Sequence, residues 1–202
     1  MLAGMVLAAG ASSRFGAIKQ LQSIDSQTML NIAIEKLANI TDNKMVVVLG
    51  ANHEIIKASI PNQMAYTVAE DWQMGMAASI KQGLQHLIDH YGDKMSHLLI
   101  LLADQVAIDL NSLQLLIRAQ LQYPQQITAA KYNGILGAPA IFPKAFFANL
   151  ATLSGQQGAK SIINQFIQQV NAVELPLAKI DIDTVQDLRE WQTGANTQHS
   201  ED

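Results

Sequence analysis

The residues best suited to chemistry lie near the start of the chain, where an apolar run opens into a loop of small residues. Leu7-Ala8-Ala9 leads into Gly10-Ala11-Ser12-Ser13-Arg14-Phe15-Gly16, and Lys19 follows shortly after. Small residues let backbone N–H groups approach an anion. A guanidinium grips phosphate oxygens through two donors and an ammonium adds a point charge. Arg14 and Lys19 therefore suit an extended polyphosphate better than a single carboxylate.

Two common phosphate-binding motifs do not fit this loop. A Walker loop has four residues between its glycines and Lys-Ser/Thr directly after the second, whereas five residues separate Gly10 from Gly16 and Ala17 follows. The dinucleotide fingerprint fails because Ser12 stands where its second glycine belongs. A plain strand-to-helix loop with surface cations is the simpler alternative.

Two carboxylates far apart in the sequence are candidate metal ligands. Asp104 ends the apolar run 98–103, so it must lie at the solvent edge or have a strong partner. Mg²⁺ is such a partner, because it takes one or two carboxylates together with water and phosphate oxygens; Asp183 is the best second ligand. Each residue has a simpler interpretation as a helix cap, Asp104 for the next helix and Asp183 for the segment after Thr184.

The segment from Gly75 to Ser79 precedes a clear helical pattern. Its free N–H groups are expected to face a ligand, and Ser79 adds a hydroxyl group. An ordinary loop and first helical turn is the alternative.

Apolar runs alternate with helical spacing along the chain, which predicts strands over 5–9, 44–49 and 97–103 and helices over 29–40 and 77–91. This alternation implies a mostly parallel α/β sheet. Ligands of such sheets bind beyond the carboxyl ends of the strands, where the Gly10 loop and Asp104 both lie. Downstream we expect a helix over 110–121, strand-turn-strand over 127–142 with its break at Asn133-Gly134, and helices over 144–150, 159–170 and 185–191.

Composition narrows the function classes. The 202 residues fit one domain, which we place at 1–192, and apolar periodicity stops in 193–202, which we expect to be a disordered tail. Charged residues make up only 15% and the net charge is −4, which argues against a nucleic-acid partner. The start of the chain lacks a basic signal-peptide region, and no apolar stretch is long enough to span a bilayer. The chain has no cysteine, which is compatible with a reducing cytoplasm. We therefore expect a soluble cytoplasmic protein.

Four motifs occur in the order seen in small nucleotidyltransferases of the MobA-like NTP transferase type, and over residues 5–191 they most closely resemble the molybdenum cofactor cytidylyltransferase family. They are the Gly10 loop through Lys19-Gln20-Leu21, Gly75-Met76-Ala77-Ala78-Ser79-Ile80, Ala103-Asp104-Gln105 and Asp181-Ile182-Asp183-Thr184. The resemblance implies a single-domain, Rossmann-like sheet with helices on both faces, similar to nucleotide-diphospho-sugar transferases.

The resemblance also implies a site and a reaction. CMP from CTP would pass to the phosphate of molybdenum-bound molybdopterin and pyrophosphate would leave, with a molybdenum hydroxylase or its maturation factor as protein partner. The resemblance assigns catalytic roles to Arg14, Lys19 and Asp104. It assigns the binding of Mg²⁺ to Asp104 and Asp183. Ala9 and Gln105 resemble the cytidylyl branch rather than the guanylyl branch. Nucleotide binding is implied for Leu7, Ala8, Ala9, Gly10, Arg14, Lys19, Gly75, Ser79 and Asp104.

Departures from the family pattern fall on the acceptor side. Val106 stands where the family has Pro, Ala138 where it has His, and Gln156 where it has Asp. Two alternatives therefore stay open. One is transfer to a sugar or alditol phosphate, and the other is a nucleotide-binding regulator with weak catalysis, against which the pair of metal carboxylates argues.

Overall fold

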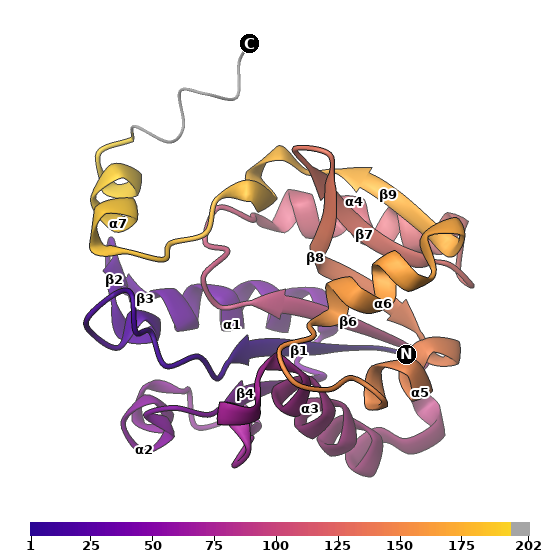
Figure 1. Cartoon of the computed structure of the whole chain (residues 1–202), viewed down its shortest axis with the longest axis horizontal. Coiled ribbons are helices and arrows are strands. Elements are labelled where there is room, and N and C mark those ends of the chain that lie inside the picture. Colours follow the sequence, from indigo (N-terminus) through magenta and orange to yellow (C-terminus); the bar gives the residue numbers. More distant parts are fainter. Residues whose placement is uncertain (195–202) are drawn as a thin grey trace.

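A seven-stranded sheet forms the centre of the structure, a computed structural model that describes residues 1–194 (Figure 1). The strand order is β5-β4-β1-β6-β8-β7-β9. Strand β8 is antiparallel to β6 and β7, and every other pairing in this sheet is parallel. The strands are β1 (Leu2–Ala8), β4 (Met45–Leu49), β5 (Tyr66–Val68), β6 (His97–Leu102), β7 (Ile127–Tyr132), β8 (Ile135–Pro143) and β9 (Val170–Glu174).

Helices cover both faces of the sheet because its central strands are apolar on both sides. Along β1, Met5 and Leu7 join one buried cluster while Val6 and Ala8 join the other, as the two-residue period of a strand requires. The first cluster packs against α3 (Met76–Tyr91), α5 (Phe147–Ala151) and α6 (Ala159–Gln165), and the second against α1 (Met29–Thr41) and α4 (Leu110–Gln122).

A third, smaller core lies where several loops meet beside the sheet. It joins the hairpin of β2 (Ser23–Ile24) and β3 (Gln27–Thr28) to α7 (Val185–Gln192), which lie close together in Figure 1. We call it the Phe15 cluster, and its buried members are Phe15, Ile24, Met29, Val106, Ile182 and Leu188. Phe15 follows Arg14, Ile182 precedes Asp183, and Val106 lies two residues after Asp104, so this core holds separate site loops together.

The structure confirms the predicted fold class and most of its elements. The helix expected over 159–170 is wrong at its end: α6 stops at Gln165, a 3₁₀ turn follows, and β9 begins at Val170. Strands β2, β3, β5 and β9 and the short helix α2 (His53–Ile56) were not predicted. The proposed tail lies outside the described residues apart from Thr193 and Gly194. Within residues 1–194, no helix has both the length and the apolar character to cross a membrane.

Candidate functional site

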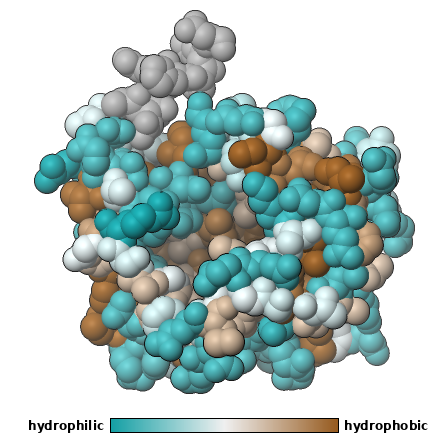
Figure 2. All heavy atoms as spheres, in the orientation of Figure 1, coloured by the Kyte–Doolittle hydropathy of each residue, from teal (hydrophilic) through white to brown (hydrophobic). Residues whose placement is uncertain are grey.

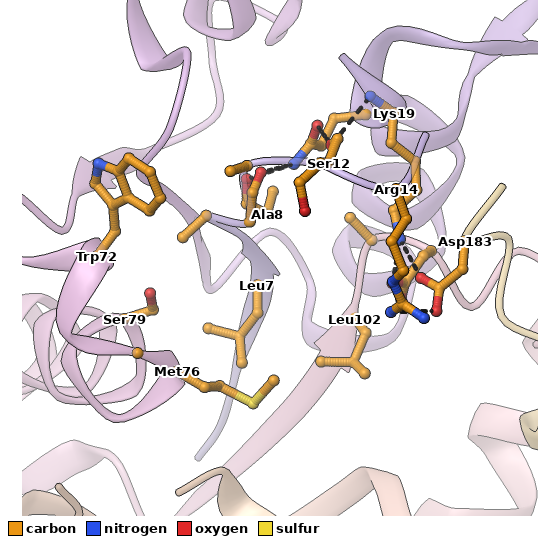
Figure 3. Close-up of a pocket in the computed structure, with 18 of the residues that line it drawn as sticks. Leu7, Ala8, Ser12, Arg14, Lys19, Trp72, Met76, Ser79, Leu102 and Asp183 are labelled. Carbon is orange, nitrogen blue, oxygen red and sulfur yellow. Dashed lines mark hydrogen bonds and ion pairs between the residues drawn. The ribbon is translucent and has the colours of Figure 1, made fainter. Parts of the chain in front are cut away.

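A cavity of about 500 Å³ lies at the carboxyl ends of β1 and β6, and every predicted site residue lines it (Figure 3). Pockets of this size commonly hold small ligands. Figure 2 shows that the surface is hollowed near the middle of one face, with hydrophilic residues around the rim. The structure therefore brings together the Gly10 loop, the start of α3 and the two acidic segments, namely Leu7, Ala8, Ala9, Gly10, Arg14, Lys19, Gly75, Ser79, Asp104 and Asp183.

The Gly10 loop is held in shape by one buried side chain, that of Gln20. Its Nε2 donates to the carbonyl oxygens of Ala8 at 3.1 Å and Gly10 at 2.9 Å, and its Oε1 accepts from Ser12 Oγ at 3.1 Å. Ser12 Oγ in turn accepts from the backbone N–H of Lys19 at 3.2 Å. Gln20 thus ties the two ends of the loop together, a role that the motif contained but sequence reasoning did not assign.

With the carbonyls of Ala8 and Gly10 directed to Gln20, the loop is left with unused donors. Within the described part of the chain, the backbone N–H groups of residues 10–14 donate to no protein acceptor. A Cβ built on Gly10 meets no atom within 4 Å, so the space beside this backbone is open. Consecutive N–H groups facing open space are suited to binding phosphate oxygens.

Two cations and two carboxylates form one connected group at the edge of the cavity. Lys19 Nζ lies 2.8 Å from Asp104 Oδ2 and 2.8 Å from Asp183 Oδ1, and Arg14 donates to Asp183 Oδ2 at 2.8 Å. Burial alone would lower the pKa of Lys19, but the two carboxylates outweigh it and raise that pKa above its ordinary value. The pKa of Asp183 is lowered, chiefly by the hydrogen bond from Lys19.

The same carboxylates fit a divalent cation. Asp104 Oδ1 is buried and, within residues 1–194, has no hydrogen-bond partner, so one acceptor oxygen of the pair is unused. No group of three or more His, Cys, Asp or Glu side chains in this described stretch could hold a metal. A site here would consist of Asp104 and Asp183 with oxygens from water and substrate, which is the coordination that Mg²⁺ prefers.

The helix-cap interpretations of the two aspartates are wrong. The N-cap of α7 is Thr184, whose side chain accepts from the N–H of Asp187 in a capping box, and the N-cap of α4 is Asp109. Both helices therefore begin without help from Asp104 or Asp183. The carboxylate of each predicted metal ligand is left to face the cations of the site.

The segment from Gly75 to Ser79 differs in part from expectation. Gly75 precedes α3 with φ 113°, a conformation that favours glycine, and Ser79 lines the cavity. The N–H groups of the first helical turn are not all free, however. Ala77 donates to the carbonyl oxygen of Gly155 at 3.3 Å and Ala78 to that of Gly75 at 3.1 Å. This turn therefore offers a ligand the hydroxyl group of Ser79 rather than a set of free N–H donors.

Asp181 adds a third carboxyl group near the site without joining the ion pairs. Burial of its carboxyl group, together with the charges of Asp104 and Asp183, raises the pKa of Asp181 to about 7, although part of the residue remains exposed. Crowding of negative charge on this side of the cavity favours a cation here.

Several residues that line the cavity were not assigned to nucleotide binding from the sequence. They come from the turn before α3, from α3 itself and from the loop before α6, and they are Trp72, Gln73, Met76 and Gln156. Gln156 is one of the three altered acceptor-side positions. The other two lie elsewhere: Val106 is buried in the Phe15 cluster, and Ala138 accepts through its carbonyl from Gln105 Nε2 at 3.0 Å.

Comparison with known proteins agrees with this geometry. The sequence profile of the family described as the MobA-like NTP transferase domain matches residues 4–172. The bifunctional protein GlmU of Legionella pneumophila is 29% identical over 129 residues, which are 62% of this chain and 27% of GlmU. The chain thus spans about a quarter of the length of that curated relative.

Solved structures share the fold at lower identity. Rv0371c from Mycobacterium tuberculosis H37Rv matches with a TM-score of 0.81 and 24% identity, over 95% of this chain and 98% of that one. A structure of Rv0371c in complex with manganese matches with a TM-score of 0.75 and 21% identity, over 95% and 98%. Molybdopterin-guanine dinucleotide biosynthesis protein A from Archaeoglobus fulgidus matches with a TM-score of 0.69 and 16% identity, over 98% and 100%.

Proposed function

The chain belongs to the MobA-like NTP transferase domain family, and from this premise we propose that it transfers CMP from CTP to the phosphate of molybdenum-bound molybdopterin and releases pyrophosphate. The observation that carries the proposal is the position of the Gly10 loop beside the carboxylates of Asp104 and Asp183. An anion cradle and a cation site in one cavity are the two parts that nucleotidyl transfer needs.

Catalysis of this kind depends on positioning and charge rather than on a protein nucleophile. An acceptor phosphate oxygen forms a bond to the α-phosphorus while the bond to pyrophosphate breaks. The N–H groups of the loop, with Arg14 and Lys19, bind and orient the triphosphate and neutralise its charge. Asp104 and Asp183 would hold Mg²⁺, which stabilises negative charge on the phosphate oxygens when bound.

Support for CTP comes from two positions near the cavity. Ala9 lines it, and Gln105 is buried directly after Asp104 with its Oε1 unpaired within residues 1–194. Both residues resemble the cytidylyl branch of the family. An added methyl group at position 9 takes space that a glycine would leave to a larger base.

Support for a molybdopterin acceptor rests on the resemblance of the motifs, with a molybdenum hydroxylase or its maturation factor as the partner it implies. A sugar or alditol phosphate is the second candidate, because Gln156 lines the cavity in place of the Asp of the family pattern. The carboxylate pair disfavours a mere nucleotide-binding regulator, since binding alone does not need a metal site.

Pyrophosphate release from each of the four ribonucleoside triphosphates, with Mg²⁺ and molybdenum-charged pterin as acceptor, tests the proposal. CTP should be strongly preferred. Equal use of GTP would contradict the cytidylyl assignment. Release only when a sugar or alditol phosphate replaces the pterin would establish the second candidate.

A further inference from the structure

The cavity that holds the Gly10 loop has a charged end and a neutral end. Figure 3 shows Trp72 and Ser79 on the side opposite Arg14, Lys19 and Asp183. Within residues 1–194, the charged side chains that line the cavity all belong to the ion-paired group of Arg14, Lys19, Asp104 and Asp183. If a triphosphate occupies the charged end, its uncharged nucleoside extends toward Trp72.

Trp72 is held at this end from both sides. Its backbone N–H donates to the carbonyl oxygen of Ala69 at 3.0 Å, and its backbone carbonyl accepts from the N–H of Gly75 at 3.0 Å. A Cβ on Gly50 would lie 2.7 Å from Trp72 Cβ and 2.7 Å from the carbonyl oxygen of Ala9. The absence of a side chain at Gly50 therefore lets Trp72 approach the end of β1, next to the start of the phosphate loop.

Only part of the Trp72 indole is used in packing against the protein. It packs against the buried cluster on the α3 face and also lines the cavity. Trp72 is half-buried, and within residues 1–194 its Nε1–H donates to no protein group. A half-buried indole with a free donor is a flat aromatic surface on which a nucleobase can stack.

We propose that Trp72 is the platform on which the base of the bound nucleotide stacks. This inference rests on the proposed nucleotide chemistry and adds a residue that recognises the base rather than the phosphates. Because stacking on an aromatic ring tolerates any base, Trp72 supplies affinity for nucleosides as a class. Selection among the bases would fall to other residues of the cavity.

Tryptophan fluorescence gives a direct test, because the chain has only two tryptophans. Trp191 lies on α7 against the Phe15 cluster, so Trp191→Phe leaves Trp72 as the single tryptophan reporter. We would titrate this variant with CTP and with inorganic tripolyphosphate, both in the presence of Mg²⁺. CTP should quench Trp72, and tripolyphosphate should displace CTP without quenching. Equal quenching by tripolyphosphate, or CTP binding without any change in emission, would overturn the proposal.

Substitution provides the second readout, measured by calorimetry. Trp72→Leu should weaken CTP binding by roughly 5- to 150-fold, the range expected for one lost base stack, while Trp72→Phe keeps most of the affinity. Tripolyphosphate should bind both variants as it binds the wild type. Met74→Leu is the matched control, since Met74 lies in the same 3₁₀ turn but outside this cavity. Equal affinity of Trp72→Leu and wild type for CTP would refute a stacking role.

The outcomes separate this inference from the proposed function. If CTP quenches Trp72 and Trp72→Leu binds CTP more weakly, but no pyrophosphate is released with any phosphate acceptor, Trp72 remains a base platform and the transfer reaction is contradicted. Transfer that proceeds with unchanged CTP affinity in Trp72→Leu would contradict the platform alone. If no nucleoside triphosphate binds the protein, both are wrong.

Discussion

The backbone N–H of Ile182 donates to the carbonyl oxygen of Asp104 at 3.3 Å, and this bond joins the two segments that carry the candidate metal ligands. Ile182 is fully buried in the Phe15 cluster beside Val106, which follows Asp104 by two residues. The relative position of Asp104 and Asp183 is thus set by backbone and core packing as well as by their shared partner Lys19. A substitution of either carboxylate should leave this framework intact.

We predict that the variants Asp104→Asn and Asp183→Asn keep the fold but lose most of the turnover. The remaining activity of each variant should require a higher Mg²⁺ concentration than that of the wild type. The physical reason is that a neutral amide replaces a carboxylate ligand of a hard cation. Magnesium titrations of activity, together with melting temperatures of the same proteins, measure both effects.

The matched control for these two variants is Thr184→Ala. Thr184 is the observed N-cap of α7, so its loss should cost about 1 kcal/mol of stability while the magnesium requirement stays unchanged. The shared metal site would be refuted if both aspartate variants kept the magnesium dependence of the wild type.

A second prediction concerns Lys19, which binds both carboxylates in the structure. Lys19→Ala should reduce rate or triphosphate affinity by about one to two decades, because a lost charge-assisted contact costs roughly 1.5–3 kcal/mol. The variant also leaves Asp104 without its cation. Added Mg²⁺ should therefore raise the melting temperature of nucleotide-free Lys19→Ala more than that of the wild type.

Kinetics and thermal melts with and without Mg²⁺ test both parts of the Lys19 prediction. Lys81→Ala, an exposed lysine of α3, serves as the control and should behave as the wild type does. Unchanged kinetics in Lys19→Ala would show that this lysine serves only as a partner of the carboxylates.

Gly10 offers a third test, aimed at the cradle itself. A Cβ at Gly10 has no neighbour within 4 Å and its φ is not in the left-handed region, so Gly10→Ala should fold with nearly unchanged stability. The added methyl group would enter the space beside the unused N–H groups and weaken triphosphate binding. Calorimetric titration with CTP and a melting curve measure the two quantities. Wild-type affinity in Gly10→Ala would place the phosphates elsewhere.

The sequence predicted the parts of the fold that burial dictates strongly. Strand β4 and, after His97, strand β6 are continuous apolar runs, as expected in a sheet that is covered on both faces. Strand β9 is half-exposed at the sheet edge, and its apolar residues continued the helical pattern that precedes it, so the change from helix to strand left no local signal.

The sequence predicted which residues line the cavity, but it did not predict the roles that only tertiary contacts assign. Asp183 and Thr184 are both good N-cap residues, and only the capping box in the structure shows that Thr184 takes this position. Gln20 stands inside the recognised motif, but its bonds to Ala8 and Gly10 require the folded loop. Trp72 reaches the cavity because Gly50, from another strand end, leaves room for it.

The last prediction concerns Lys36, whose Nζ donates to the carbonyl oxygen of Val106 at 2.7 Å and so supports the loop after Asp104. Burial lowers the pKa of Lys36 to about 8 from 10.5, against the opposing charges of Asp109 and Glu35. Between these two values the unfolded chain binds more protons at Lys36 than the folded protein does. Stability should therefore rise with pH across this window, by roughly 2–3 kcal/mol from this group, because solvent screening of its exposed part reduces the full effect of the shift.

Lys36→Met removes the titrating group, so the variant should lack this rise. The informative quantity is the wild-type free energy of unfolding minus that of the variant, from urea melts at several pH values, because the subtraction removes contributions that both proteins share. This difference should increase as pH passes through about 8 toward 10.5. Lys81→Met, which replaces an exposed lysine of α3, serves as the surface control for the substitution itself. A difference between wild type and Lys36→Met that does not vary with pH would mean that Lys36 is protonated alike in the folded and unfolded chain, in conflict with its partly buried position against Val106.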